Sequence, residues 1–497
     1  MLAQILYNLA FIKPEIALTI TLCAALVMDL LYKNRTGLVA GVVLGGFLAA
    51  AIGLAGQAGF STSVFNGALV IDPFSNFFKM VILACSAFIV LFSLGSDEVT
   101  AMKNRKGEYY ALLAAMALGM FLMVSATDLL VMYVTLELSS LTSYILSGSM
   151  KAQKNSSEAS LKYLLYGAFS SGVMLYGISI IYGLTGSLNI FVINSVIAQG
   201  SASSPALLIA GIFLLVGFGY KISAVPFHFW TPDVYEGAPT TITAFLSVAS
   251  KAAGFGMLMR AFKVVFIDAG VLGVPGTWSL LHGIDAQSIL IVLSILTMTL
   301  GNLVALWQEN VKRLLAYSSI AHAGYMLLGL VVLGNDGFSA TMLYFVIYMF
   351  MNLGAFYIVI LVSNKTGNET MESYKGLGAR SPFLAVAMGT FLFSLAGIPP
   401  TAGFIGKFYI FAALINAKMI ALAIVGVLNS VVSLYYYARV FRNMFLRDST
   451  TETTLIPVAR PTYVLVLLLL LPTIILGLYF GPLAQFAQYS VAMFGIK

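Results

Sequence analysis

Long apolar runs, separated by short polar or turn-forming stretches, follow one another along almost the whole chain. Each run is close to the roughly 20 residues that an α-helix needs to cross a bilayer. The first run has no small-residue cleavage site, so we expect it to be retained as a helix. The pattern predicts an all-α polytopic membrane protein with about 14 transmembrane helices, at residues 15–33, 38–57, 73–95, 109–125, 128–149, 158–184, 205–236, 240–265, 289–307, 311–333, 338–363, 382–416, 418–445 and 460–481.

The composition agrees with a membrane protein and excludes several other classes. The chain is 60% hydrophobic and only 9% charged, whereas soluble domains average about 25% charged residues. Its formal net charge of +7 comes from basic residues scattered over short loops, which indicates orientation signals rather than nucleic-acid binding. Cys23 and Cys85 lie in apolar runs and are too few for an iron–sulfur cluster or a zinc site, so we expect them to pack.

The distribution of lysine and arginine predicts the orientation, because loops on the cytoplasmic side carry the excess of positive charge. Sixteen of the 26 follow odd-numbered spans: Lys33, Arg35, Lys103, Arg105, Lys106, Lys151, Lys154, Lys312, Arg313, Lys365, Lys375, Arg380, Arg439, Arg442, Arg447 and Arg460. The opposite side, termini included, holds Lys13, Arg260, Lys263, Lys418 and Lys497. Both termini are therefore expected on the outer side. Five lysines are left within the spans: Lys79, Lys162, Lys221, Lys251 and Lys407.

Two blocks of five spans, 109–265 and 289–445, each carry a broken helix as their fourth member. Pro226 interrupts the first and Pro399-Pro400 the second, because proline removes a backbone donor and clashes with the preceding turn. Five crossings make the second block enter the membrane from the opposite side, as in inverted-repeat transporters with paired interrupted helices at the transport site. We therefore divide a single membrane domain, 1–497, into N-terminal helices at 1–108, the two repeats, and a C-terminal helix at 460–497.

Ionisable residues deep within the spans are candidates for a proton path. Glu137 is the acid that lies mid-span, and Lys221, Lys251 and Lys407 are the deep cations. Such a charge costs about 2.5–3.5 kcal/mol on insertion scales, so it is usually retained for function. We expect Glu137 to pair with Lys221, so that its withdrawal lets the lysine release a proton. The alternatives are a protonated structural acid, and lysines solvated by freed carbonyls or reaching the headgroups.

The remaining ionisable residues are placed less deeply or lie in polar turns. Lys79 and Lys162 are near span ends, where we expect orientation or surface pairing. His322, in the stretch YSSIAHAGYM, can relay a proton because a histidine titrates near working pH, or can be a hydrogen-bonded core histidine. We expect His228 to be structural and His282 to be solvated in an external loop. Three histidines so far apart in sequence do not indicate a metal site.

Several stretches of the chain are similar to those of a known family: Ser156-Ser157-Glu158-Ala159 followed by LKYLLYGAFSSG, then KISAVPFHFWTPDVYEGAPT, NVKRLLAYSSIAHAGY and LAGIPPTAGFIGKFY. With these the chain resembles the antiporter-like membrane subunits of respiratory complex I over essentially its whole length. The resemblance implies two inverted five-helix bundles and a water-linked axis of a glutamate and lysines along the membrane midplane. On this axis it places Glu137, Lys221 of the first broken helix, the connecting Lys251, and Lys407 of the second broken helix.

The resemblance also implies a proton-translocating subunit of an NADH (or ferredoxin):quinone oxidoreductase. No cofactor is then expected in this chain, while quinone, flavin and iron–sulfur clusters are expected in partner subunits. The implied partners are the other membrane subunits of complex I and the lipid bilayer, in a bacterial cell inner membrane, with a thylakoid or organelle membrane as the alternative. Two other functions stay open: a subunit of a cation/proton antiporter without redox coupling, and a scaffold whose channel is not used.

Overall fold

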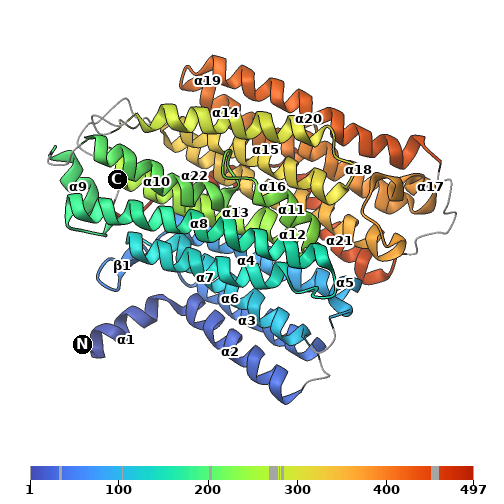
Figure 1. Cartoon of the computed structure of the whole chain (residues 1–497), viewed down its shortest axis with the longest axis horizontal. Helices are drawn as coiled ribbons and strands as arrows, with labels where there is room; N and C mark the ends of the chain where they lie inside the picture. Colours follow the sequence, from blue (N-terminus) through green and yellow to red (C-terminus); the bar gives the residue numbers. More distant parts are fainter. Residues whose placement is uncertain are drawn as a thin grey trace.

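The computed structural model describes residues 2–32, 36–102, 105–200, 204–267, 278, 280, 285–448 and 458–495. Its long helices run side by side along the long axis of the molecule (Figure 1), as expected where each span must satisfy its own backbone hydrogen bonds. The helices before the first break are α1 (Leu2–Phe11), α2 (Lys13–Leu31), α3 (Thr36–Ala55), α4 (Pro73–Leu94), α5 (Asp97–Thr100), α6 (Lys106–Ser125), α7 (Leu129–Ser147), α8 (Lys154–Thr185), α9 (Ile190–Ala198) and α10 (Ser204–Ile222). A short hairpin of β1 (Thr62–Val64) and β2 (Leu69–Ile71) joins α3 to α4.

The rest of the chain is also helical. It comprises α11 (Trp230–Gly237), α12 (Thr240–Phe245), the π-helix η1 (Leu246–Ser250), α13 (Lys251–Phe266), α14 (Ala286–Ala305), α15 (Val311–Val331), α16 (Asn335–Thr366), the 3-10 helix η2 (Met371–Tyr374), α17 (Leu377–Arg380), α18 (Pro382–Ala396), α19 (Ala402–Asn416), α20 (Ile420–Leu446), α21 (Arg460–Leu478) and α22 (Gly481–Ser490).

The predicted spans are confirmed, and so are both predicted breaks. Thirteen helices of the described chain are long and apolar enough to cross a membrane. The span predicted at 382–416 consists of the two shorter apolar helices α18 and α19, and the one at 205–236 consists of α10 and α11. The hydrophobic pattern missed the short elements α1, α9, α22 and the β-hairpin, because none of them is long enough to give a span.

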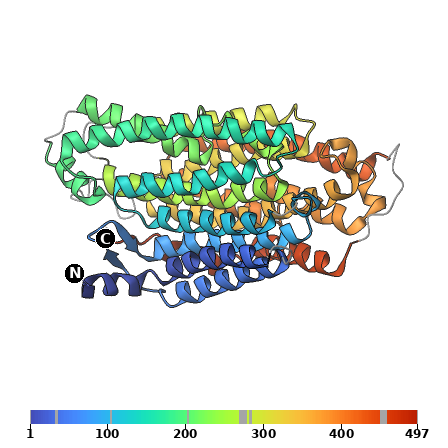
Figure 2. The same cartoon turned by 60° about the horizontal axis from the view of Figure 1, so that its bottom comes forward.

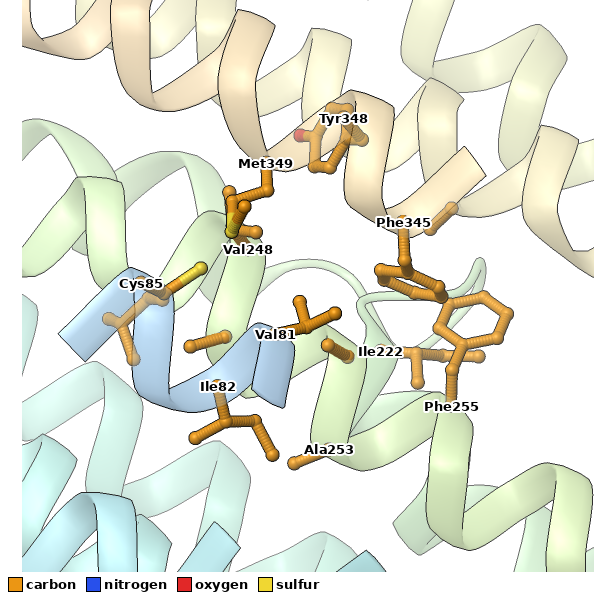
Figure 3. Packing of buried hydrophobic residues seen from close by; sticks show 14 of the residues in the cluster. Val81, Ile82, Cys85, Ile222, Val248, Ala253, Phe255, Phe345, Tyr348 and Met349 are labelled. Carbon is orange, nitrogen blue, oxygen red and sulfur yellow. The ribbon is translucent and has the colours of Figure 1, made fainter. Parts of the chain in front are cut away.

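The helices that carry the deep polar residues lie in the centre of the bundle. The continuous segment Thr240–Phe266 and α15 are almost entirely buried and α16 is largely buried, whereas α2 and α21 are mostly exposed. The N-terminal helices α1, α2 and α3 lie along one edge (Figures 1 and 2). Figure 3 shows apolar side chains of α4, η1, α13 and α16 packed together in the centre, among them Cys85, Val248 and Met349. This packing shields the central helices from lipid.

The two cysteines have different surroundings. Cys85 is buried, which confirms that it packs. Cys23 is exposed, so its predicted packing role is wrong, because α2 lies at the edge of the bundle.

A buried ion pair fastens α4 to α13. Asp72 is the N-cap of α4 and accepts a hydrogen bond from the Ser75 backbone. Both of its oxygens also receive the Arg260 guanidinium, at 2.8 Å each, and both side chains are fully buried. Arg260 lies near the end of α13, which continues to Phe266.

The two termini lie at the same end of the bundle (Figure 1), as an even number of crossings requires. Which end faces the cytoplasm stays a prediction, as does the inverted equivalence of the two five-helix blocks. Lys33, Arg35, Lys103 and Lys497, which the orientation used, lie outside the described residues.

Candidate functional site

Lys221 lies at the end of α10, where the first broken helix stops. Ser223 adopts a φ of 62°, a left-handed conformation that is uncommon for residues other than glycine and ends the helix there. The Lys221 side chain is buried, and its Nζ donates to Ser139 Oγ at 2.8 Å and to Ser140 Oγ at 3.1 Å. The ammonium group is thus held by hydroxyls of α7 rather than by carbonyls freed at the break.

Glu137 lies on α7 two residues before Ser139. Its Oε1 is buried and has no hydrogen-bond partner. Among the ion pairs of the described residues, none joins Glu137 to Lys221. The two side chains therefore make no direct ion contact in this structure, although Glu137 lies close enough for its charge to act on the Lys221 amine.

Lys251 is the first residue of α13 and follows the π-helix η1 directly. A π-helical turn inserts an extra residue into the helix and occurs often at functional sites. Lys251 is 2% exposed. Its Nζ donates to the Ser319 backbone carbonyl at 2.8 Å and to Ser319 Oγ at 2.7 Å. The lysine expected to connect the two blocks therefore reaches from the first block to α15 of the second.

His322 lies one turn beyond Ser319 on α15 and is fully enclosed. Its Nδ1 is 2.7 Å from the Tyr344 hydroxyl, and its Nε2 is 3.2 Å from the Tyr437 hydroxyl. Ser318 Oγ lies 2.5 Å from the same Tyr437 oxygen. A neutral imidazole carries one donor and one acceptor nitrogen, so each of these contacts can be satisfied in either tautomer.

Lys407 lies on α19, after the second break. Its Nζ donates to the Ala396 carbonyl and to Ser430 Oγ, both at 2.9 Å. Ala396 is the last residue of α18, so here a carbonyl freed by the break does solvate the ammonium group. The Nζ also lies 4.7 Å from the centre of the Tyr325 ring, a favourable cation–π distance.

Helix α15 links Lys251 to Lys407. Ser319 binds Lys251, His322 follows three residues later, and the Tyr325 ring faces Lys407 after three more. Residues three or four apart share one face of a helix, and six residues rise about 9 Å. The structure thus brings three of the five predicted residues together along one polar face.

The side chain of Lys221 packs against Gly254 of α13, close to Lys251. A Cβ on Gly254 would lie 3.1 Å from Lys221 Cγ, so the lysine stem packs closely against α13. Gly254 is three residues, or one turn, after Lys251. The structure therefore orders the side chains as Glu137, Lys221, Lys251, His322 and Lys407.

The two lysines near span ends, Lys79 and Lys162, are ion-paired. Lys162 is paired with Glu158 at 2.7 Å and Asp233 at 2.6 Å, in agreement with the expected surface pairing. Lys79 is paired with Glu15 at 2.6 Å but is fully buried, so the expectation of a surface position was wrong. The reason is that α3 and α6 pack against α4, with the Phe121 ring of α6 lying 6.0 Å from the Lys79 Nζ.

Of the other histidines, His228 is buried beside Phe229 and makes no contact with the five residues above. His282 lies outside the described residues. In the part of the chain that the structure describes, no group of three or more His, Cys, Asp or Glu side chains could hold a metal ion.

Sequence reasoning missed the neutral partners of the buried amines. Serine pairs stand beside the candidates in the stretches ELSS and YSSIAH, and this spacing was a usable signal. The tyrosines gave none, because 25 are spread over the chain. No sequence pattern indicates the π-helix before Lys251 either.

The chain matches the family described as NADH:quinone oxidoreductase/Mrp antiporter, TM, over residues 126–433. It is 51% identical over 435 residues to NADH-quinone oxidoreductase subunit N 2 of Chloroherpeton thalassium, which covers 87% of this chain and 84% of the relative. A chain of respiratory complex I from Thermus thermophilus, solved with bound aureothin, is 31% identical with a TM-score of 0.77 over 95% of this chain and 98% of that one. A chain of the Mrp complex from Dietzia sp. has a TM-score of 0.81 at 22% identity over 97% of each chain, a likeness of fold alone.

Proposed function

Because this chain belongs to the NADH:quinone oxidoreductase/Mrp antiporter transmembrane family, as a relative of subunit N of NADH-quinone oxidoreductase, we propose that it conducts protons through Glu137, Lys221, Lys251, His322 and Lys407. It is a membrane subunit of a complex I type oxidoreductase, and the other subunits of that complex are its partners. A cation/proton antiporter without redox coupling has the lesser support, a likeness of fold.

One observation carries the proposal: Lys221, Lys251 and Lys407 are buried, and none of them forms an ion pair with a carboxylate. Lys221, Lys251 and Lys407 bind only hydroxyl and carbonyl oxygens among the described residues. Lys79 and Lys162 have carboxylates within 2.7 Å. A buried charge without a counter-charge is costly. An amine with neutral partners can therefore take up or release a proton without breaking an ion pair.

The proposed mechanism uses the Glu137–Lys221 neighbourhood as the driven step. In the present arrangement the Lys221 ammonium group is held by Ser139 and Ser140. Quinone reduction in other subunits would shift Glu137 between a position near Lys221 and one away from it. Because a nearby carboxylate stabilises the ammonium form, this shift would change the proton affinity of Lys221. Protons would then pass from Lys221 to Lys251, through His322 to Lys407, and out.

The redox chemistry is assigned to the partners. We place quinone, flavin and iron–sulfur clusters in other subunits, and the choice between NADH and ferredoxin as electron donor is made there as well. We also assign the chain to a bacterial inner membrane with both termini outside, on the strength of the positive charge in the loops after odd-numbered spans.

The test compares Glu137→Ala and Lys221→Ala in the assembled complex, reconstituted into vesicles. We expect quinone reduction to continue with fewer protons translocated per electron, because the driven pair is lost. Glu158→Ala is the matched control, since Glu158 is a carboxylate paired on the surface of the same block. Wild-type stoichiometry in both core variants would reject the proposal.

A further inference from the structure

The sequence places a polar residue directly after a glycine at two points, Gly301-Asn302 on α14 and Gly324-Tyr325 on α15. A Cβ on Gly301 would lie 2.6 Å from a backbone nitrogen of α15, and one on Gly324 would collide with the backbone of α14. Small residues at such positions let two helix backbones approach closely. The two glycines therefore bring the neighbouring Asn302 and Tyr325 together inside the bundle.

The side-chain amide of Asn302 is fully buried and joins three helices. Its Nδ2 donates to the Tyr325 hydroxyl at 3.0 Å, to the Asn429 carbonyl at 3.1 Å and to Asn429 Oδ1 at 3.2 Å. Its Oδ1 accepts a hydrogen bond from the Tyr436 hydroxyl at 3.0 Å. Asn429 and Tyr436 both lie on α20, which packs against α14 (Figure 1). One amide thus fixes α15 and α20 relative to α14.

Both residues to which Asn302 donates adjoin contacts of Lys407. The Tyr325 ring is the one whose centre lies 4.7 Å from Lys407 Nζ. Ser430, the neighbour of Asn429 on α20, accepts a hydrogen bond from the same Nζ at 2.9 Å. Two contacts of the ammonium group, a ring face and a hydroxyl, are therefore held in place from α14.

The ring contact of Lys407 needs this support more than a serine contact does. Lys221 and Lys251 bind serine hydroxyls, and a hydroxyl can rotate to meet an amine. An aromatic ring attracts a cation only through its face, so its orientation must be set by its surroundings. A buried network whose members are all hydrogen-bonded is rigid. The bond from Asn302 to the Tyr325 hydroxyl therefore keeps the ring face towards the ammonium group.

We propose that Asn302 is a positioning residue for Lys407, which holds the Tyr325 ring and the Ser430 hydroxyl where they stabilise the ammonium group. This rests on the proton-conducting role proposed above for Lys407. Asn302 itself takes up no proton and acts only through its neighbours. The neutral amine gains little from a ring face, so a misplaced ring makes Lys407 release its proton more readily.

The experiment compares the pH dependence of proton translocation among variants of the assembled complex. Asn302→Leu removes the amide at nearly constant volume, and Tyr325→Phe keeps the ring but removes its hydroxyl. The two are made singly and together. Asn194→Leu is the matched control, because Asn194 also donates to two acceptors, the carbonyls of Val265 and Ile267, but lies on α9. Protons per electron are measured over a series of pH values, in vesicles that hold the same pH inside and outside.

We expect the pH at which protons per electron fall to half to move down by about one unit in Asn302→Leu, the equivalent of a tenfold loss of proton affinity. Tyr325→Phe should move it in the same direction and by less, since Ser430 stays in place. The double variant should match Asn302→Leu alone, because the hydroxyl has no role once the amide is gone, whereas independent residues would give the sum of the two shifts. Asn194→Leu should lower the unfolding temperature and keep the wild-type pH profile.

An unchanged pH profile in Asn302→Leu, a shift equal to that of Asn194→Leu, or additive shifts in the double variant would overturn the proposal. Asn302→Ser is the substitute should Asn302→Leu fail to assemble, because its shorter side chain has one donor and cannot hold two helices, and the same shift is expected of it. A negative result leaves the proton-conducting role standing, since that role is judged by protons per electron in the Glu137 and Lys221 variants.

Discussion

Gly397 is the residue whose substitution tests the position of Lys407 most directly. It ends α18 with a φ of 88° and a ψ of 42°. A Cβ at this position would lie 2.9 Å from Lys407 Cδ and 3.5 Å from its Nζ. Gly397→Ala therefore introduces backbone strain and also pushes the lysine stem away.

The two effects have different magnitudes. A non-glycine residue in the left-handed region costs roughly 1–2 kcal/mol. Carbon atoms pack best at about 3.5–4.0 Å, so the stem must move by about 0.6–1 Å. The two 2.9 Å hydrogen bonds of Lys407, to Ala396 and Ser430, would then stretch beyond useful length. Bonds to a charged group contribute about 1.5–3 kcal/mol each, so the displacement outweighs the strain.

The chain offers a matched control for the strain alone. Gly367 ends α16 with a φ of 66°, and a Cβ added there would meet nothing within 4 Å. Both alanine variants are introduced into the complex, which is reconstituted into vesicles, and protons translocated per electron are measured on the assembled fraction. We expect Gly397→Ala to translocate fewer protons per electron and Gly367→Ala to match the wild type.

Equal stoichiometry in the two variants would refute this reasoning. It would mean that the position of the Lys407 ammonium group does not limit proton transfer. A loss of assembly common to both variants would instead measure the backbone strain.

Three further results are expected. Asp72→Asn should lower the stability of the complex by about 3–5 kcal/mol, because it leaves the Arg260 charge buried and unpaired, as thermal unfolding would show. Burial raises the pKa of Asp72, but the Arg260 charge outweighs burial and holds that pKa below its ordinary value. The stability that the ionised Asp72 contributes is therefore lost only in acid. The difference in stability between Asp72→Asn and the wild type should not change between about pH 6 and pH 8. Tyr344→Phe removes a hydroxyl 2.7 Å from His322 and should reduce protons per electron, whereas an unchanged ratio would exclude the histidine as a relay. Glu15→Gln should lower the unfolding temperature and leave protons per electron intact, and a lower ratio would place that ion pair in the path.

The sequence by itself determined the membrane spans, the two breaks and the depth of Lys221, Lys251 and Lys407, but not the burial of Lys79 and Lys312. These follow from local rules, because a span needs about 20 apolar residues, a proline interrupts a helix, and a charge in the bilayer is costly wherever it stands. Each rule concerns one segment and can be applied without knowing its neighbours. The order of Lys221, Lys251 and Lys407 along the chain was therefore readable at once.

Only the tertiary structure decided what each amine contacts. Lys221 meets serines 82 and 81 residues away in sequence, and Lys251 meets Ser319 across 68 residues. Lys312 looked like any other loop cation but is buried between two carboxylates. Such partners depend on how helices from separate blocks pack, and packing couples positions that share no local pattern. Residue type thus told which groups could carry a proton, while the packing of the helices decided which of them are free of a counter-charge.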